Sequence, residues 1–126
     1  MNIKQNIKKI KHQTHGTQLI VVTKKQSSDK IIRAYNAGER EFGENRVQDI
    51  LLKKDKLPND IKWHMIGHLQ TNKVKLIAPH IHMIQSVDSI KLLKKINEYA
   101  KKYNRTINCL IQIKISKEKT KYGFEI

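Results

Sequence analysis

The stretch TQLIVVTKKQSSDKIIRAYNAG, residues 17–38, decides the fold that the sequence predicts. Its first eight residues form an apolar, β-branched run that ends in a polar segment, which is typical of a buried strand. Ser27 or Ser28 can then cap a helix with an apolar inward face, and Gly38 marks its end. The stretch therefore predicts one complete βα unit.

The same alternation of short apolar runs and longer amphipathic segments recurs along the rest of the chain. It predicts four more strands, near residues 40–43, 61–67, 82–87 and 107–115. Helices are expected between them, over about 45–54, over about 71–78, and from a cap at Ser86 or Asp88 to about 103. Five strands in this succession fit a doubly wound parallel sheet or the first five strands of an eight-stranded (β/α) barrel, so the predicted class is α/β.

Length and composition limit the kind of protein. A chain of 126 residues is expected to form one domain, 1–126, with a leading helix in 1–15 and the βα units in 17–126. No apolar stretch approaches the about 20 residues that cross a bilayer, and the start lacks the apolar core of a signal peptide. The single cysteine, Cys109, suits a reducing compartment and a place in the core. We therefore expect a cytoplasmic protein without a membrane partner.

The chain is strongly basic, with a formal net charge of +15 at pH 7. Such a charge is usually a sign of polyanion binding, but all except four of the 26 basic residues are lysine, and arginine is the better fit to phosphate. An A/T-rich coding sequence explains abundant lysine without a nucleic-acid partner. We expect no specific nucleic acid to bind, and keep a small basic polyanion-binding module as an alternative.

Lys24 is the most informative residue of the first unit. No GxGxxG or GxxxxGK[ST] motif follows the first strand, so the usual signs of nucleotide cofactors are missing. A lysine at the carboxyl end of a buried strand faces the side where α/β proteins bind ligands, and apolar surroundings favour its nucleophilic form. Lys24 can thus be a reactive amine or an ordinary solvated lysine.

Four motifs together make the sequence specific: VVTK at 21–24, FGENRVQD at 42–49, WHMIGHLQTNK at 63–73 and IQSVDS at 84–89. In this order and spacing they resemble the pyridoxal phosphate homeostasis protein family, and the likeness continues through 110–113 and 121–123. The resemblance implies a (β/α)8 TIM barrel of the alanine racemase N-terminal-domain type, of which about five strands are present. It also implies pyridoxal 5′-phosphate (PLP) as cofactor, held as a Schiff base on Lys24, with a role in PLP homeostasis and no catalytic turnover.

Three further residues are candidates for the cofactor site, because the strand ends of such a barrel converge on one mouth. Asn45 can hydrogen-bond to a pyridine ring or can cap the next helix. Gly67, like Gly43, can allow the backbone to approach a ligand or can simply serve a turn. Ser86 is the fourth candidate, and no residue is predicted to be catalytic.

Metal binding is not expected from the sequence. Six histidines and one cysteine are present: His12, His15, His64, His68, His80, His82 and Cys109. Their spacing forms no CxxC, HExxH or CxxC…HxxxH motif, which are the local patterns of designed zinc sites. Histidines on a strand are more often packed or hydrogen-bonded than catalytic.

The chain also departs from the family. A complete barrel needs about 250 residues and usually grips phosphate near strands seven and eight, and the family's glycine- and serine-rich phosphate motifs are missing here. Lys114 stands where the family commonly has Asn. Apolar strand edges left unpaired would favour self-association. The hypotheses are therefore a truncated PLP-binding protein, the polyanion-binding module, and a non-functional remnant of a degraded gene.

Overall fold

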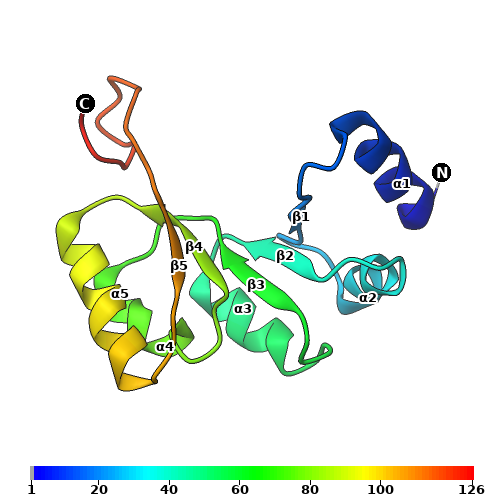
Figure 1. Ribbon diagram of the computed structural model, residues 1–126, viewed down its shortest axis with the longest axis horizontal. Coiled ribbons are helices and arrows are strands. Elements are labelled where there is room, and N and C mark those ends of the chain that lie inside the picture. The colour runs from blue at the N-terminus through cyan, green and yellow to red at the C-terminus, as the bar shows by residue number, and fades with distance from the viewer. Residues whose placement is uncertain (1) are drawn as a thin grey trace.

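The computed structural model describes residues 2–126, which form helices and strands around one curved sheet (Figure 1). The strands are β1 (Val21–Val22), β2 (Glu41–Glu44), β3 (Lys62–Met65), β4 (Met83–Val87) and β5 (Asn108–Ile111). The helices are α1 (Ile3–Thr14), α2 (Ser28–Asn36), α3 (Val47–Lys54), the short 3-10 helix η1 (Thr71–Lys73), α4 (Val74–Ile77) and α5 (Ile90–Lys102). This is the βα succession that the sequence predicts.

The sheet order decides between the two predicted architectures. All neighbouring strands pair in parallel, and their order is β1-β2-β3-β4-β5, the same as their order in the chain. A doubly wound sheet would reverse direction at a switch point, whereas a barrel adds each strand on the same side. The fold is therefore an arc of a (β/α) barrel, and Figure 1 shows α2 to α5 along one side of it.

The hydrophobic core lies between the sheet and these helices. Phe42, Trp63 and Ile84 supply it from the central strands, and Ile50 and Leu92 supply it from the helices. All five side chains are buried, and the Phe42 and Trp63 rings lie 6.1 Å apart between centroids. Burial of this layer, at about 25 cal/mol per Å² of apolar surface, is the main force that holds the arc together.

The two outer strands differ from the prediction. The sequence favours a buried strand over 17–24, but only Val21–Val22 is a strand, and Val22 is 56% exposed. The long strand expected over 107–115 is reduced to Asn108–Ile111, and Ile111 is 53% exposed. Each outer strand has one neighbour in the sheet, so one edge and one face stay open to solvent.

The starts of α2 and α5 test the helix caps that the sequence predicts. Ser27 caps α2 by accepting a hydrogen bond from Lys30 N at 3.3 Å, as predicted. The expected cap of α5 at Ser86 or Asp88 is wrong: Ser89 accepts from Leu92 N at 3.1 Å. Strand β4 continues through Val87, which moves the helix start beyond both predicted residues.

Two remaining sequence expectations concern Cys109 and the membrane. Cys109 is half-buried against the core, and burial raises the pKa of its thiol above the ordinary value. Within residues 2–126, no helix is both long enough and apolar enough to cross a bilayer.

Candidate functional site

The four predicted site residues lie toward the carboxyl ends of the strands. Lys24 comes two residues after β1, Asn45 directly after β2, and Gly67 two residues after β3, while Ser86 is the next-to-last residue of β4. Parallel strands direct these ends to one edge of the sheet. The structure thus brings the four positions to a single edge, hereafter the carboxyl edge.

Lys24 occupies an exposed turn at this edge. The turn is closed by Gln26 N donating to Thr23 O at 3.0 Å, and Lys25 adopts the left-handed conformation with φ 58°. Thr23 itself is buried, and its backbone N donates to Gly43 O at 3.0 Å. Lys24 itself is exposed, which differs from the apolar surroundings that the sequence predicts for it.

A buried ion pair supports the turn that carries Lys24. The Glu44 side chain is fully buried, and Lys53 Nζ lies 2.7 Å from Glu44 Oε2. The same ammonium donates to Thr23 O at 2.8 Å, and Thr23 Oγ1 donates to Glu44 Oε2. This cluster joins β1, β2 and α3 beneath the site. Sequence spacing does not reveal this pair, because Lys53 follows Glu44 by nine residues and only the βα packing brings the two charges together.

Asn45 and Gly67 are in direct backbone contact. A Cβ built on Gly67 would lie 2.8 Å from Asn45 Cα, which is too close for any side chain. The close approach predicted at Gly67 is therefore made to the neighbouring strand end. Asn45 is half-buried and does not cap α3, because the helix begins at Val47 with Arg46 in the cap position.

Gly43 allows close packing rather than an open approach. A Cβ there would lie 3.1 Å from Ile66 Cδ1 and 3.2 Å from Ile20 Cγ2. The side chains of Ile66, directly after β3, and of Ile20, directly before β1, therefore close over this glycine. Within the described residues, the backbone of Gly43 is covered by them.

Ser86 differs from the other three because its side chain is buried, at 1% exposure. Its Oγ has no hydrogen-bond partner among the described residues. The pairing of β4 with β5 is irregular between Ile84 and Val87, so Ser86 lies where the strand register shifts. A buried hydroxyl without a partner costs free energy, and polar ligands are one way to satisfy it.

An aromatic pair covers part of the carboxyl edge. The His68 ring stacks on Tyr122 with centroids 3.6 Å apart and an angle of 10° between the planes. His68 Nδ1 also lies 3.1 Å from Asp88 Oδ2, which fixes the ring. The stack joins the loop after β3 to the C-terminal segment, a contact between residues 54 positions apart in the chain that sequence spacing does not reveal.

A cavity of about 360 Å³ lies beside Asn45, between α3 and the η1–α4 segment. Arg46, His68 and Lys73 contribute its basic lining, and Met65 lies in its wall. The cavity shares Asn45 and His68 with the carboxyl edge. It is therefore continuous with the candidate site, although Lys24 does not line it.

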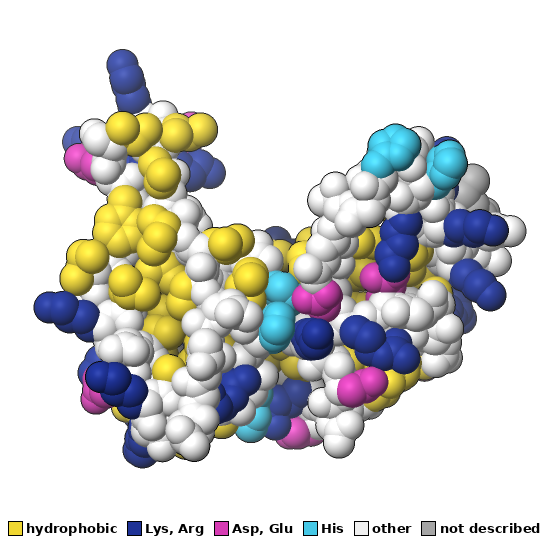
Figure 2. Space-filling view, in the orientation of Figure 1, with side chains coloured by type: hydrophobic (Ala, Val, Ile, Leu, Met, Phe, Trp, Pro, Cys, Tyr) yellow, Lys and Arg dark blue, Asp and Glu magenta, His cyan; other side chains and the backbone are white. Residues whose placement is uncertain are grey.

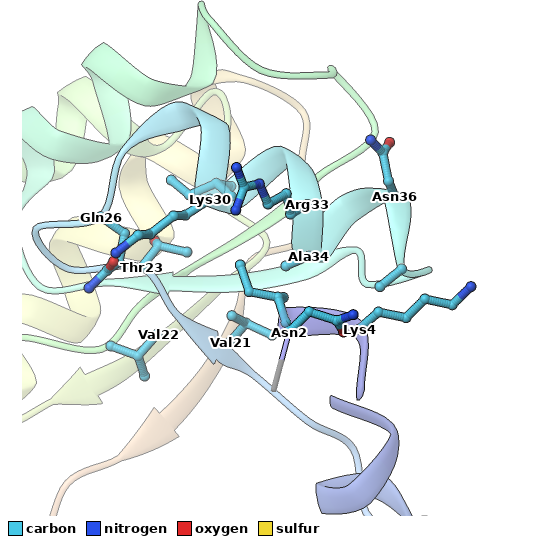
Figure 3. A pocket seen from close by; sticks show the side chains of 13 residues that line it. Asn2, Lys4, Val21, Val22, Thr23, Gln26, Lys30, Arg33, Ala34 and Asn36 are labelled. Atoms are coloured by element: carbon cyan, nitrogen blue, oxygen red, sulfur yellow. The ribbon is translucent and has the colours of Figure 1, made fainter. Parts of the chain in front are cut away.

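A second cavity, of about 680 Å³, is an open groove between α1, β1 and α2 (Figure 3). Val21 and Val22 line it from the strand, and Ile31 and Ala34 line it from α2. Figure 3 shows Lys4 of α1 at the same groove. It follows the strand edge that has no neighbour, and so it marks a place where the sheet is incomplete.

The positive charge is not gathered on the face seen in Figure 2. Lys and Arg side chains appear there as separate spots over the whole outline, with acidic side chains between them. The same view shows the face hollowed between α1 and the C-terminal segment, with apolar side chains on its walls.

Comparisons with known proteins agree with the fold. Among curated proteins, the "Pyridoxal phosphate homeostasis protein" of Pasteurella multocida is 36% identical over 98% of this chain and 54% of its own length. The protein of the same name from Mus musculus is 42% identical over 84% of this chain and 42% of its own length. The chain thus spans about half the length of these curated relatives.

Solved structures have the same fold as this chain. PipY of Synechococcus elongatus, with PLP bound, superposes with a TM-score of 0.90 at 34% identity, covering 98% of this chain and 58% of PipY. The structure of PipY without PLP gives a TM-score of 0.92. The family described as "Alanine racemase, N-terminal domain" matches residues 1–126. With the sheet order and the strand-end motifs already described, this match means that the chain belongs to the alanine racemase N-terminal domain family.

Proposed function

We propose that this chain binds pyridoxal 5′-phosphate at the carboxyl edge and serves intracellular PLP homeostasis, as the names of its relatives state for them. The observation that carries the proposal is the position of Lys24, on an anchored turn directly after β1, in a chain 34% identical to a protein solved with PLP bound. The proposed protein is cytoplasmic and performs no turnover.

The residues at the edge fit the aldehyde and ring of this cofactor. Lys24 is exposed, and the preceding residue Thr23 is anchored by its Oγ1 donating to Gly43 O, so the Lys24 amine is free to condense with an aldehyde as one water leaves. The Asn45 amide can donate to and accept from ring substituents. Gly67 keeps the neighbouring strand end close, and Ser86 offers an unpaired hydroxyl.

The fit to the phosphate group is weaker. In complete barrels this group is held near strands seven and eight, and five strands are present here. Bound PLP supplies an electrophilic, electron-withdrawing ring. The chain's own contribution is to hold the Lys24 amine in place. We therefore expect affinity well below that of a full-length relative.

Borohydride trapping on the purified chain tests the proposal. After incubation with PLP and reduction, peptide mass mapping should place the label on Lys24, and the Lys24→Ala variant should lose it. Lys25→Ala is the matched control, because Lys25 is the adjacent exposed lysine in the same turn. Label spread evenly over surface lysines in all three proteins would contradict the proposal and support the remnant hypothesis.

Self-association belongs to the same proposal. The groove along β1 and the exposed residues of β5 offer unpaired strand edges to a second copy.

The polyanion-binding alternative is not favoured by any clustering of charge on the face seen in Figure 2. Weak, salt-sensitive, sequence-independent binding is what dispersed lysines predict.

A further inference from the structure

Three side chains outside the carboxyl edge converge on the sheet: Glu41, His64 and His82. Glu41 is the first residue of β2, His64 lies within β3, and His82 directly precedes β4. In the sheet register, Gly43 pairs with His64 and His64 pairs with Met83, so the three residues come from adjacent strands. Glu41 and His82 lie at the amino ends of β2 and β4, and none of the three belongs to the four positions of the carboxyl edge.

The donor atoms of this cluster have the spacing of a metal site. His64 Nε2 lies 3.2 Å from Glu41 Oε1, and His82 Nε2 lies 3.8 Å from the same oxygen. All three donor atoms fall within 4.8 Å of one another. Tetrahedral zinc with bonds of about 2.0–2.1 Å places its ligand atoms about 3.3 Å apart, so small side-chain rotations bring the three donors onto one ion.

The surroundings also suit a cation. The His64 side chain is buried, at 2% exposure, so one side of the cluster is shielded from water. The His82 side chain is 32% exposed and that of Glu41 is 20% exposed, which leaves an entry path and room for a water ligand.

Gln85 supplies the outer contact that a metal-binding histidine needs. Its side-chain amide lies 3.0 Å from His64 Nδ1 on the side of the ring opposite Glu41. In the metal-free form, His64 Nε2–H donates to Glu41 and Gln85 Nε2 donates to Nδ1. When an ion takes Nε2, the proton moves to Nδ1, and the flipped Gln85 carbonyl accepts it.

We propose that Glu41, His64 and His82 form a binding site for a divalent transition metal, with Zn²⁺ as the reference ion and water as the fourth ligand. A two-histidine, one-carboxylate set is a ligand combination that zinc uses with an open fourth position. The ion would join β2, β3 and the start of β4. The site is independent of PLP binding, because it shares no residue with the carboxyl edge.

Titration of the full chain with Zn²⁺ alone, in the absence of PLP, tests the site. The wild type should bind one equivalent in calorimetry, show a higher melting temperature, and give the absorbance of a low-symmetry Co²⁺ centre when Co²⁺ replaces zinc. His82→Ala and Glu41→Gln should weaken binding by more than the about 100-fold that outer-contact changes reach, and Gln85→Leu by about 10–100-fold.

The control removes the other adjacent histidines. His12 and His15 lie near the end of α1 with ring centroids 6.4 Å apart, and a variant with both replaced by Ala should bind zinc as the wild type does. Circular dichroism without metal checks that each variant is folded. The proposal is overturned if the wild type shows no saturable binding, if His82→Ala binds equally well, or if only the His12/His15 variant loses it.

Discussion

The middle strands of the sheet and its two outer strands contain similar apolar residues, but these side chains are buried in the middle strands and half-exposed in the outer ones. In β2, β3 and β4 the apolar residues Phe42, Trp63 and Ile84 are buried, at 0–3% exposure. In β1 and β5, Val22 and Leu110 are about half-exposed, at 56% and 49%. Apolar sequence predicts that a strand forms, but burial depends on having neighbours on both sides.

The functional residues follow the same division. Lys24 sits on the poorly covered strand β1, yet its turn is anchored from the well-packed part of the molecule through Thr23 and the Glu44–Lys53 pair. The middle of the sheet therefore positions the amine, and the open strands leave it accessible. This division makes four predictions, given in order of expected effect.

The largest effect is expected from the buried ion pair. Lys53→Ala leaves the carboxylate of Glu44 buried, with Thr23 Oγ1 as its one remaining partner among the residues that the structure describes, which should cost about 3–5 kcal/mol in the free energy of unfolding. Lys54→Ala is the matched control, because Lys54 pairs with an exposed Asp55 and should cost at most about 1 kcal/mol. Urea unfolding of both variants measures the difference. Equal losses would show that the pair does not hold the middle of the sheet together.

A smaller effect is expected where two strand ends touch. Gly67→Ala drives a methyl group into the Asn45 backbone, and we expect a loss of about 1–3 kcal/mol, as for overpacking elsewhere. Gly43→Ala meets methyl groups of the Ile66 and Ile20 side chains at 3.1 and 3.2 Å, which need to shift by only a few tenths of an ångström, so its cost should be below about 1 kcal/mol. Thermal unfolding compares them. A greater loss of stability for Gly43→Ala than for Gly67→Ala would contradict the prediction that the backbone contact between Gly67 and Asn45 is the tighter of the two.

The outer strands should affect association more than stability. We expect the wild type to self-associate at tens of micromolar and the double variant Val22→Lys, Leu110→Lys to sediment as a monomer, with a change in unfolding free energy within about 0.5 kcal/mol. Leu52→Lys, at a residue 62% exposed on α3, is the control away from the edges and should leave association unchanged. A wild type that is monomeric throughout would show that the open edges attract no second copy.

The sequence predicted the order of the elements, because periodicity and caps are local. It could not predict which strands would be buried, because the apolar run at 19–22 has the same residues whether its strand has one neighbouring strand in the sheet or two. It also missed the Glu44–Lys53 pair and the Glu41–His64–His82 cluster, whose members meet only across the sheet. The absence of metal motifs led to the expectation of no metal, which stays a prediction until the zinc titration decides it.

The smallest effect on stability is expected at Ser86, and it separates binding from folding. Its Oγ is buried and has no hydrogen-bond partner within residues 2–126, so Ser86→Ala removes an unsatisfied group and should leave the unfolding free energy unchanged or slightly raised. If PLP satisfies this hydroxyl, the variant should lose affinity by about 2–12-fold, the equivalent of one hydrogen bond of about 0.5–1.5 kcal/mol.

Ser89→Ala provides the opposite pattern as a control. Ser89 caps α5, and its loss should lower stability by about 0.5–2 kcal/mol without a direct effect on the cofactor. Equilibrium titration with PLP and urea unfolding, done on both variants, distinguish the two roles. A Ser86→Ala protein that is destabilised yet binds PLP normally would remove Ser86 from the site and leave Lys24, Asn45 and Gly67 to form it, because a hydroxyl that serves only the fold cannot contribute to affinity.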